Sequence, residues 1–386
     1  MSRDAVIRVS ISPGEVRVAG LLGDRLEAAW IERPFQPDSV GDLYLARVSA
    51  ISPAMSGAFL TLAEGLTGFL PESELPPPRR PIAKALQVGL ALPVRVTRAA
   101  QGGKGPRGTA RLKPPELALA EGAPAPALLK RGDDAALRLA RAWGDSPIIT
   151  DGAAMAARLR ASLEAGRITL QHGAVFDAEL EEAFAELASP RVALPGGASL
   201  TIHPTPALTA IDVDAGSLAG SRDGIAHERM NVVAAQEVAR QIRLRNLAGA
   251  ILVDFAGLSV RRRETLVAPL AEALQGDPLG PRLLGMTQLG LMEIVRPRIH
   301  LPLHEVLGLP PTALTHGLAA LRQALREVSA RPGTALRLVA APEVVQALAA
   351  VPQALDSYRL AAGRTLILLP DRGSRLGEER IEELPA

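Results

Sequence analysis

Apolar and polar residues alternate through most of the first hundred positions, which is the pattern of β-strands. The alternation runs through residues 5–32, is interrupted by the turn sequence Ser-Pro-Gly at 12–14, and predicts a strand pair of the hairpin type. It continues through 39–98, where turn sequences divide it at 41–42, 52–53 and 64–65. Short strands at this spacing predict a small β-barrel.

Helical periodicity begins only after a stretch rich in Gly, Pro, Lys and Arg at 101–126, which is predicted to be a loop with at most one strand at its centre. Residues 128–190 then alternate apolar runs with helix-like patterns. A long helix is predicted near 226–247, with Gly249 as the residue that ends it. The strands predicted around that helix are 199–202, 208–213 and 250–255.

The sequence Leu-Pro-Pro at 309–311 is predicted to be a hinge before a small α/β appendage, with a helix at 314–329 and strands at 336–340 and 365–369. No run of about 18 apolar residues occurs, and the N-terminus lacks a signal-peptide pattern. The chain has no cysteine, which excludes disulfides and thiolate-bound metals. We therefore expect a soluble, cytoplasmic protein without a membrane partner.

The charge composition is unusual in one respect. The net charge of the 386 residues is only +2, but four of the 43 basic residues are lysines and all the others are arginines. Arginine binds phosphate in a bidentate manner, so this bias favours a nucleic-acid ligand. A GC-rich genome would produce the same bias, and composition alone leaves both explanations open.

Three carboxylates are candidates for a metal site. Asp212 and Asp214 are two apart on a predicted strand and therefore share a face, and Asp254 lies at the end of another apolar strand. Sites made of carboxylate oxygens suit Mg²⁺ or Mn²⁺, which activate water for attack on a phosphodiester. The alternative is that these acids only end their strands and cap the following turns.

Arginines surround these acids in the sequence. Arg240 and Arg243 lie on one face of the predicted long helix, and Arg296 and Arg298 follow the apolar run 289–294. A carboxylate site with arginines around it is suited to binding and cleaving a polyanion. The alternative is a solvated, ion-paired helix face, because Glu228, Glu237 and Glu264 are nearby in sequence.

The predicted barrel carries three of the ten aromatic residues, Tyr44, Phe59 and Phe69. Exposed aromatic rings on a small barrel stack on single-stranded bases, and Lys104 and Arg107 in the following loop would bind phosphates. The alternative is that these rings belong to the barrel core. The six histidines form no metal-binding motif and are interpreted as incidental.

Several blocks of the sequence together resemble the ribonuclease E/G family. ALTAIDVD at 207–214, NVVAA at 231–235, ARQIRLRNLAG at 239–249 and ILVDF at 251–255 resemble its catalytic core, and TQLGLMEIVRPR at 287–298 resembles the next block. Upstream, GDLYLARV at 41–48, GAF at 57–59 and TGFLP at 67–71 resemble its S1 RNA-binding barrel. The resemblance covers most of residues 1–308 in order.

The resemblance implies a multidomain α/β architecture. It consists of an RNase H-like subdomain at 1–36 plus 125–195, an inserted S1 (OB-type) barrel at 37–124, a DNase I-like catalytic subdomain at 196–308, and a small C-terminal α/β domain at 309–386. The activity implied is that of a Mg²⁺-dependent endoribonuclease that cuts single-stranded, AU-rich RNA in RNA processing or decay. By motif matching, Asp212 and Asp254 bind the metal, and Phe59, Phe69 and Lys104 contact RNA.

The chain departs from the family pattern in three places. Asp214 stands where the family commonly has Asn, which adds a negative charge beside the metal and puts activity in doubt. The paired cysteines of the family's zinc link are absent, so we expect a monomer or homodimer and no zinc-linked tetramer. The 5′-sensor segment is missing, because 104–113 leads through 114–126 directly into the RNase H-like block.

Three functions remain open. The first is a Mg²⁺-dependent endoribonuclease, with catalytic residues Asp212, Asp214 and Asp254. The second is a catalytically weak or inactive RNA-binding protein that uses the barrel. The third is a structural scaffold whose small C-terminal domain mediates assembly.

Overall fold

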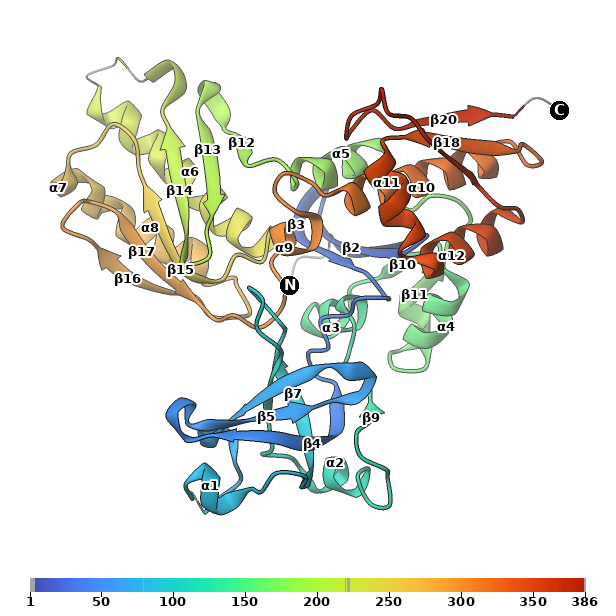
Figure 1. Ribbon diagram of the computed structural model, residues 1–386. Coiled ribbons are helices and arrows are strands. Elements are labelled where there is room, and N and C mark those ends of the chain that lie inside the picture. Colours follow the sequence, from blue (N-terminus) through green and yellow to red (C-terminus); the bar gives the residue numbers. More distant parts are fainter. Residues whose placement is uncertain (1–3, 79, 219, 221–222, 385–386) are drawn as a thin grey trace. The chain divides into compact units, whose positions relative to one another are not determined.

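The computed structural model describes residues 4–78, 80–218, 220 and 223–384 and shows a mixed α/β protein (Figure 1). The chain divides into two compact units. The larger unit combines the chain up to Pro37 with Ala135–Pro297 and the chain from Pro302 onward. The barrel unit comprises Asp38–Asp134 together with the short segment Arg298–Leu301.

The barrel unit contains a closed five-stranded β-barrel, which confirms the predicted barrel. Its strand order is β5-β6-β8-β7-β4, and pairing of β4 with β5 closes it, while β9 pairs with β4 outside the ring. Alternate side chains such as Ala58, Leu60 and Leu70 fill its interior. The elements are β4 (Leu43–Ser52), β5 (Gly57–Thr61), β6 (Thr67–Pro71), α1 (Ile82–Ala85), β7 (Ala91–Arg98), β8 (Arg107–Thr109), α2 (Pro114–Ala118) and β9 (Ala127–Lys130).

The first sheet of the larger unit has the order β11-β10-β1-β2-β3. The predicted hairpin is present as β1 and β2, and β3 continues it through a second turn at Gly23, whose φ of 59° needs a glycine. Helices follow the strands that 128–190 supplies, as the alternating pattern predicted. The elements are β1 (Ala5–Ser12), β2 (Glu15–Leu22), β3 (Arg25–Glu32), α3 (Ala135–Ala142), β10 (Ile148–Thr150), α4 (Ala153–Arg160), β11 (Ile168–Leu170) and α5 (Ala178–Glu186).

The second sheet of the larger unit has the order β12-β13-β14-β15-β17-β16. One of its faces is buried, because Ile211, Val213, Ile251 and Val253 pack with the buried side of α6 in one apolar cluster. The three strands predicted here are confirmed, and β12, β16 and β17 are additional. The elements are β12 (Arg191–Ala193), β13 (Ser199–Pro204), β14 (Leu208–Asp214), α6 (Gly224–Leu244), β15 (Gly249–Asp254), α7 (Val260–Arg263), α8 (Val267–Leu274), β16 (Arg282–Met286) and β17 (Met292–Arg296).

The predicted end of the long helix is wrong by several residues. Helix α6 starts after Asp223, whose side chain accepts hydrogen bonds from the amides of Ile225 and Ala226. It ends at Leu244, and Asn246 with φ of 49° adopts the left-handed conformation that reverses the chain. Asparagine tolerates this conformation better than most residues. Gly249, predicted as the end of the helix, is instead the first residue of β15.

The C-terminal part of the chain forms a third, three-stranded sheet of order β19-β18-β20 with its own apolar cluster. The predicted helix and both predicted strands are present, with ends shifted by one or two residues. Buried Glu15 of β2 bonds Arg33 and Arg322, which ties α10 to the first sheet. The elements are α9 (Leu303–Leu307), α10 (Ala313–Ala330), β18 (Leu336–Ala340), α11 (Pro342–Ala349), α12 (Pro352–Ala362), β19 (Ile367–Pro370) and β20 (Arg380–Glu383).

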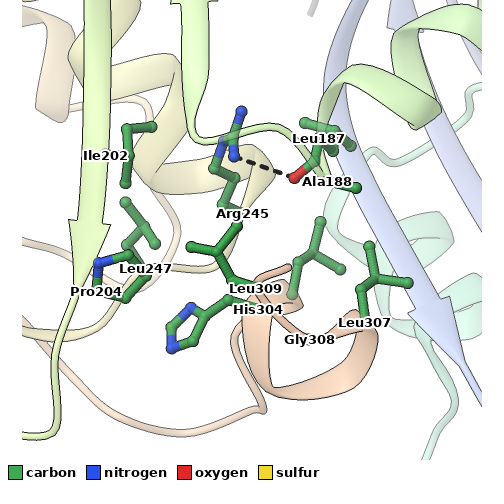
Figure 2. A pocket seen from close by; sticks show the side chains of 11 residues that line it. Leu187, Ala188, Ile202, Pro204, Arg245, Leu247, His304, Leu307, Gly308 and Leu309 are labelled. Carbon is green, nitrogen blue, oxygen red and sulfur yellow. Dashed lines mark hydrogen bonds between the residues drawn. The ribbon is translucent and has the colours of Figure 1, made fainter. Parts of the chain in front are cut away.

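A buried arginine joins three helices of the larger unit. Arg245, directly after α6, donates to the carbonyl oxygen of Leu187 beyond the end of α5 (Figure 2). It also donates to the carbonyl oxygen of Ser189. Burial lowers the pKa of Arg245 to about 10. The cavity beside it, which His304 of α9 also lines, has a volume of about 10 Å³, roughly the space that one water molecule needs. This cavity is therefore a feature of packing and too small for a substrate.

Candidate functional site

Two carboxylates meet on the open face of the second sheet. Strands β14 and β15 are parallel, and Asp212 is the register partner of Asp254. Register partners project their side chains to the same face, so the two carboxylates lie side by side on adjacent strands. Asp212 is exposed, and the side chain of Asp254 is 50% exposed. Asp214, two residues beyond Asp212, is exposed on the same face.

The local sequence explains this placement. Ile211 and Val213 alternate with the aspartates, and both are almost fully buried against α6. Since successive side chains of a strand point to opposite faces, burying these two residues forces Asp212 and Asp214 onto the open face. The polar face of β14 is thus a direct consequence of its alternating pattern.

Neighbouring groups fix two of these acids. Arg263 of α7 donates to Oδ1 of Asp254 at 2.6 Å and to the carbonyl oxygen of Gly290 at 2.9 Å, so it links the carboxylate to the turn before β17. Oδ1 of Asp214 accepts a hydrogen bond from the amide of Gly216 at 2.9 Å. The latter bond is the turn-capping role that the alternative interpretation of these acids predicted, and it uses one of the two carboxylate oxygens of Asp214.

Asp212 and Asp214 line an open hollow of about 410 Å³, which also reaches Ala256 and Gly257 just beyond Asp254. Its other lining includes Arg191 of β12, Thr201 of β13 and His227 of α6. His227 is 3% exposed and packs against Gly257, where a Cβ atom would lie 2.2 Å from its Nδ1. The interpretation of all six histidines as incidental did not anticipate that one of them lines this hollow.

The sequence also gave no reason to single out Arg191 or Asn231. Asn231 is fully buried, and its Nδ2 donates to the carbonyl oxygens of His227 and Ala256, which holds the loop after Asp254 on α6. Arg191 enters the site because β12 pairs with β13 through the turn at Gly196 and Gly197. That Gly-Gly turn was the one signal from which the pairing could have been found.

The carboxylate pair has the chemistry of a site for a hard divalent cation. Asp212 and Asp254 offer oxygen atoms from adjacent strands, and ions such as Mg²⁺ use one or two carboxylates while keeping water and phosphate as their other ligands. Within the described residues, no group of three or more His, Cys, Asp or Glu side chains is close enough to hold a metal. Any ion here would therefore depend on a minimal set of protein ligands.

The arginines of α6 are occupied by contacts within the protein. Arg240 donates to the carbonyl oxygen of Leu26 and to Glu237, and Arg243 bonds Glu27 at 2.8 Å. These bonds pin α6 to β3 of the first sheet. This geometry agrees with the alternative interpretation, an ion-paired helix face. Neither Arg240 nor Arg243 lines the hollow that contains Asp212.

The two arginines after β17 have different environments. Arg296 is 3% exposed, and its guanidinium bonds the buried Asp277 and the side chain of Asn246. In this conformation Arg296 cannot reach a phosphate, so its prediction as an RNA contact finds no support here. It instead links β17 to Asn246, where the chain reverses after α6. Arg298 belongs to the barrel unit and is partly exposed.

The barrel unit presents a row of side chains across three strands. Phe59 of β5 pairs with Phe69 of β6, and Phe69 pairs with Arg107 of β8. The two rings meet edge to face with centroids 5.4 Å apart, and both are only partly buried. Their neighbours along each strand fill the barrel interior, so the rings lie on its outer face. A hollow of about 410 Å³ beside them is lined by Phe69 and Arg107.

The remaining barrel residues divide between core and surface. Tyr44 is 1% exposed, and its hydroxyl donates to Asp42, so this ring belongs to the core and its burial raises the pKa of the phenol. Lys104 is exposed in the turn between β7 and β8. Arg107 lies in the short strand β8, and the prediction for 101–126 allowed one strand within the loop.

Comparison with known families provides the class of protein to which this fold and site belong. The model of the ribonuclease E/G family matches residues 120–299, which include every acid of the hollow. Ribonuclease E of Nostoc sp. (strain PCC 7120) is 36% identical over 204 residues, 48% of this chain and 29% of the relative. Ribonuclease E of Synechocystis sp. (strain PCC 6803) is 28% identical over 367 residues, 70% of this chain and 54% of the relative.

A third relative matches along almost its whole length. Ribonuclease G of Escherichia coli (strain K12) is 25% identical over 452 aligned positions, 89% of this chain and 92% of the relative. Residues 120–299 thus match the ribonuclease E/G family, and the chain is similar to ribonucleases E and G over most of its length. It spans about a third and about half of the two ribonuclease E relatives described above. Across the part of the chain that the structure describes, no helix is long and apolar enough to cross a bilayer.

Proposed function

We propose that this protein is an endoribonuclease that cleaves single-stranded, AU-rich RNA with Mg²⁺, or Mn²⁺ in its place, in cytoplasmic RNA processing or decay. The observation that carries this proposal is the register pairing of Asp212 with Asp254 on the open sheet face. The pair lies inside the region that matches the ribonuclease E/G family. The names of the relatives support the reaction class.

The residues of this chain divide the work as follows. Asp212 and Asp254 hold the cation with one carboxylate each. A divalent cation bound there supplies Lewis acidity and makes a bound water more acidic, which is the chemistry that phosphodiester hydrolysis needs. Arg263 orients Asp254 through its hydrogen bond to Oδ1. Asp214 is held by the amide of Gly216 and lines the hollow.

The barrel would capture the substrate. Phe59 and Phe69 offer adjacent, partly exposed rings for stacking on unpaired bases, which favours single strands because paired bases are already stacked. Arg107 beside Phe69 and the exposed Lys104 are placed to bind phosphates of the same strand. Arg298 is a further candidate in this unit.

The subdomain assignments belong to the same proposal. The first sheet with α3–α5 corresponds to the RNase H-like subdomain, the second sheet to the DNase I-like catalytic subdomain, and the closed barrel to the S1 domain. The chain from 309 onward corresponds to the small C-terminal domain. With no cysteine in the sequence, we propose a monomer or homodimer without a zinc-linked tetramer.

A second candidate function rests on Asp214. A carboxylate at this position adds negative charge next to Asp212 and Asp254, and this charge repels an approaching phosphate. If that repulsion dominates, the protein is an RNA-binding protein with weak or no cleavage.

One experiment separates the two. The purified protein is incubated with a fluorescent single-stranded AU-rich oligonucleotide in Mg²⁺, in Mn²⁺ or in EDTA, next to Asp212→Asn. The proposed function requires cleavage that needs the metal and is lost in the variant. Binding without cleavage in either metal would establish the second function instead.

A further inference from the structure

A row of polar side chains crosses the open face of the second sheet. Arg191 of β12 pairs with Thr201 of β13, Thr201 pairs with Asp212 of β14, and Asp212 pairs with Asp254 of β15. Successive register partners project to the same face. The row therefore runs from the carboxylate pair to the outer strand of the sheet and ends in a cation.

Arg191 and Asp212 line the same hollow. Neighbouring strands lie about 4.8 Å apart, which places the Cα atoms of Arg191 and Asp212 roughly 10 Å apart across the sheet. An arginine side chain is long enough to cover the strand between them. Among the described residues that line the hollow, Arg191 is the one arginine or lysine, and Ser199 and Thr201 of β13 lie between its strand and that of Asp212 and Asp214.

The side chain of Arg191 differs from the arginines nearby. Arg240, Arg243 and Arg296 are bound to carboxylates of the protein, and Arg263 is bound to Asp254. Arg191 is exposed on the edge strand, and its backbone is fixed by bonds to the Ser189 hydroxyl. Its guanidinium thus keeps its bidentate capacity for a ligand in the hollow.

We propose that Arg191 binds the phosphate next to the one that is cleaved, so that the RNA strand crosses the sheet from β15 towards β12. This inference rests on the proposed function, since it needs a phosphodiester at Asp212 and Asp254. Arg191 is then a positioning residue: it fixes the register in which the strand lies over the two carboxylates. The ligand is defined by its chemistry as a second backbone phosphate of the same RNA.

The test combines protein variants with neutralised phosphates. Arg191→Ala and Arg191→Lys are compared with the wild type, and Arg282→Ala, on the opposite edge strand β16, is the matched control. After the cleaved bond is mapped, oligonucleotides are prepared with a single methylphosphonate at each flanking linkage. Loss of a charge-assisted bidentate contact predicts a fall in kcat/KM of roughly 10- to 100-fold for Arg191→Ala, with Arg191→Lys in between.

At one flanking linkage, the methylphosphonate should slow the wild type by a similar factor and leave Arg191→Ala unaffected. The inference is overturned if Arg191→Ala cleaves like Arg282→Ala, or if each methylphosphonate slows wild type and Arg191→Ala equally. If the wild type cleaves nothing in Mg²⁺ or Mn²⁺, the proposed function fails. The affinities of wild type, Arg191→Ala and Arg282→Ala for one unmodified single-stranded oligonucleotide, measured in EDTA, then test Arg191 alone: weaker binding of Arg191→Ala only supports its phosphate contact, and equal binding overturns it.

Discussion

At the residue scale, Asp254 combines one cationic partner within the protein with an exposed side. In the structure its Oδ1 accepts a hydrogen bond from Arg263 at 2.6 Å, while half of its side chain stays exposed toward the open face. The carboxylate is therefore both held in place by the protein and accessible to an ion from solvent. Replacing it tests the metal site without disturbing a buried group.

Asp254→Asn keeps the size of the side chain and removes one charged ligand. We expect the cleavage rate to fall by at least about 100-fold, because a neutral amide is a poor substitute for a carboxylate on a hard cation. The thermal midpoint should change little, since the residue is half exposed. Asp356→Asn, 65% exposed on α12, is the matched control. Turnover of Asp254→Asn at the wild-type rate, with the same need for Mg²⁺, would refute the assignment.

Replacing Glu181 of α5 tests how much one partly buried ion pair contributes to the stability of the fold. It bonds Arg17 of β2 at 2.6 Å, and Arg17 is 2% exposed beneath the ring of Phe176. Burial alone would raise the pKa of Glu181, but the hydrogen bond and charge of Arg17 outweigh it and lower the pKa. Glu181→Gln removes the carboxylate charge that pairs with this buried guanidinium, so the free energy of unfolding should fall by about 3 kcal/mol at neutral pH.

The sign of the pKa shift fixes how this loss depends on pH. A carboxyl group with a lowered pKa in the folded state stabilises the fold above its unfolded pKa, about 4.3 for Glu. That contribution disappears as the pH falls through the lower folded value. Urea unfolding should therefore show the difference between wild type and Glu181→Gln closing below about pH 4. The exposed Glu343→Gln should show no comparable difference, and a gap that does not narrow as the pH falls below about 4 would contradict this account.

At the scale of elements, the row of Phe59, Phe69 and Arg107 on the outer face of the barrel is the feature that tests RNA binding. Phe69→Ala should weaken binding of a single-stranded oligonucleotide by about 1–3 kcal/mol, the usual contribution of one stacked base. Little stability should be lost, because the ring is only partly buried. Fluorescence anisotropy and thermal melting measure the two quantities. A large drop in melting temperature with unchanged affinity would assign the ring to the core.

Gly57 offers an independent variant of the same row. A Cβ atom there would lie 2.2 Å from Cζ of Phe69, so Gly57→Ala must displace the ring while leaving it in the protein. We expect Gly57→Ala to lower RNA affinity in the same direction as Phe69→Ala. Gly166→Ala, where a Cβ atom meets nothing within 4 Å and φ is not positive, controls for the loss of a glycine.

The elements also show what the sequence could and could not predict. The alternation of Ile211 and Val213 with aspartates was sufficient to place two acids on one face of a strand. The roles of the arginines were not accessible in the same way, because Arg243 bonds a glutamate 216 residues away in sequence. Local periodicity does not reveal partners at that separation. Of the glutamates that are near these arginines in sequence, Glu237 does pair with Arg240, but the partner of Arg243 is Glu27.

At the scale of the whole molecule, the structure of residues 104–126 bears on whether a phosphate at the 5′ end of the RNA affects cleavage. Residues 104–126 contain β8, the short helix α2 and turns, and Arg107 and Thr109, the nearest candidates for a 5′-phosphate pocket, both lie in β8. Thr109 is 4% exposed, and Arg107 lies beside Phe69 on the outer row. We therefore expect oligonucleotides with a 5′-hydroxyl and a 5′-monophosphate to be cleaved at similar rates. A preference for the monophosphate of roughly tenfold, about 1.4 kcal/mol, would reveal a separate pocket.

The way the chain returns to the barrel unit has a consequence for its modularity. After leaving at residue 134, the chain comes back for four residues only, 298–301. Within this segment, the carbonyl oxygen of Ile299 accepts a hydrogen bond from the amide of Ala99, and the carbonyl oxygen of His300 accepts one from the side chain of Gln101. An isolated fragment of residues 38–134 would lack this tetrapeptide. A protein from which 38–134 were deleted would keep the tetrapeptide without the barrel residues that it bonds. The barrel is therefore not a cassette that can be exchanged by two cuts, and transplanting it into another protein requires a donor for this last short segment.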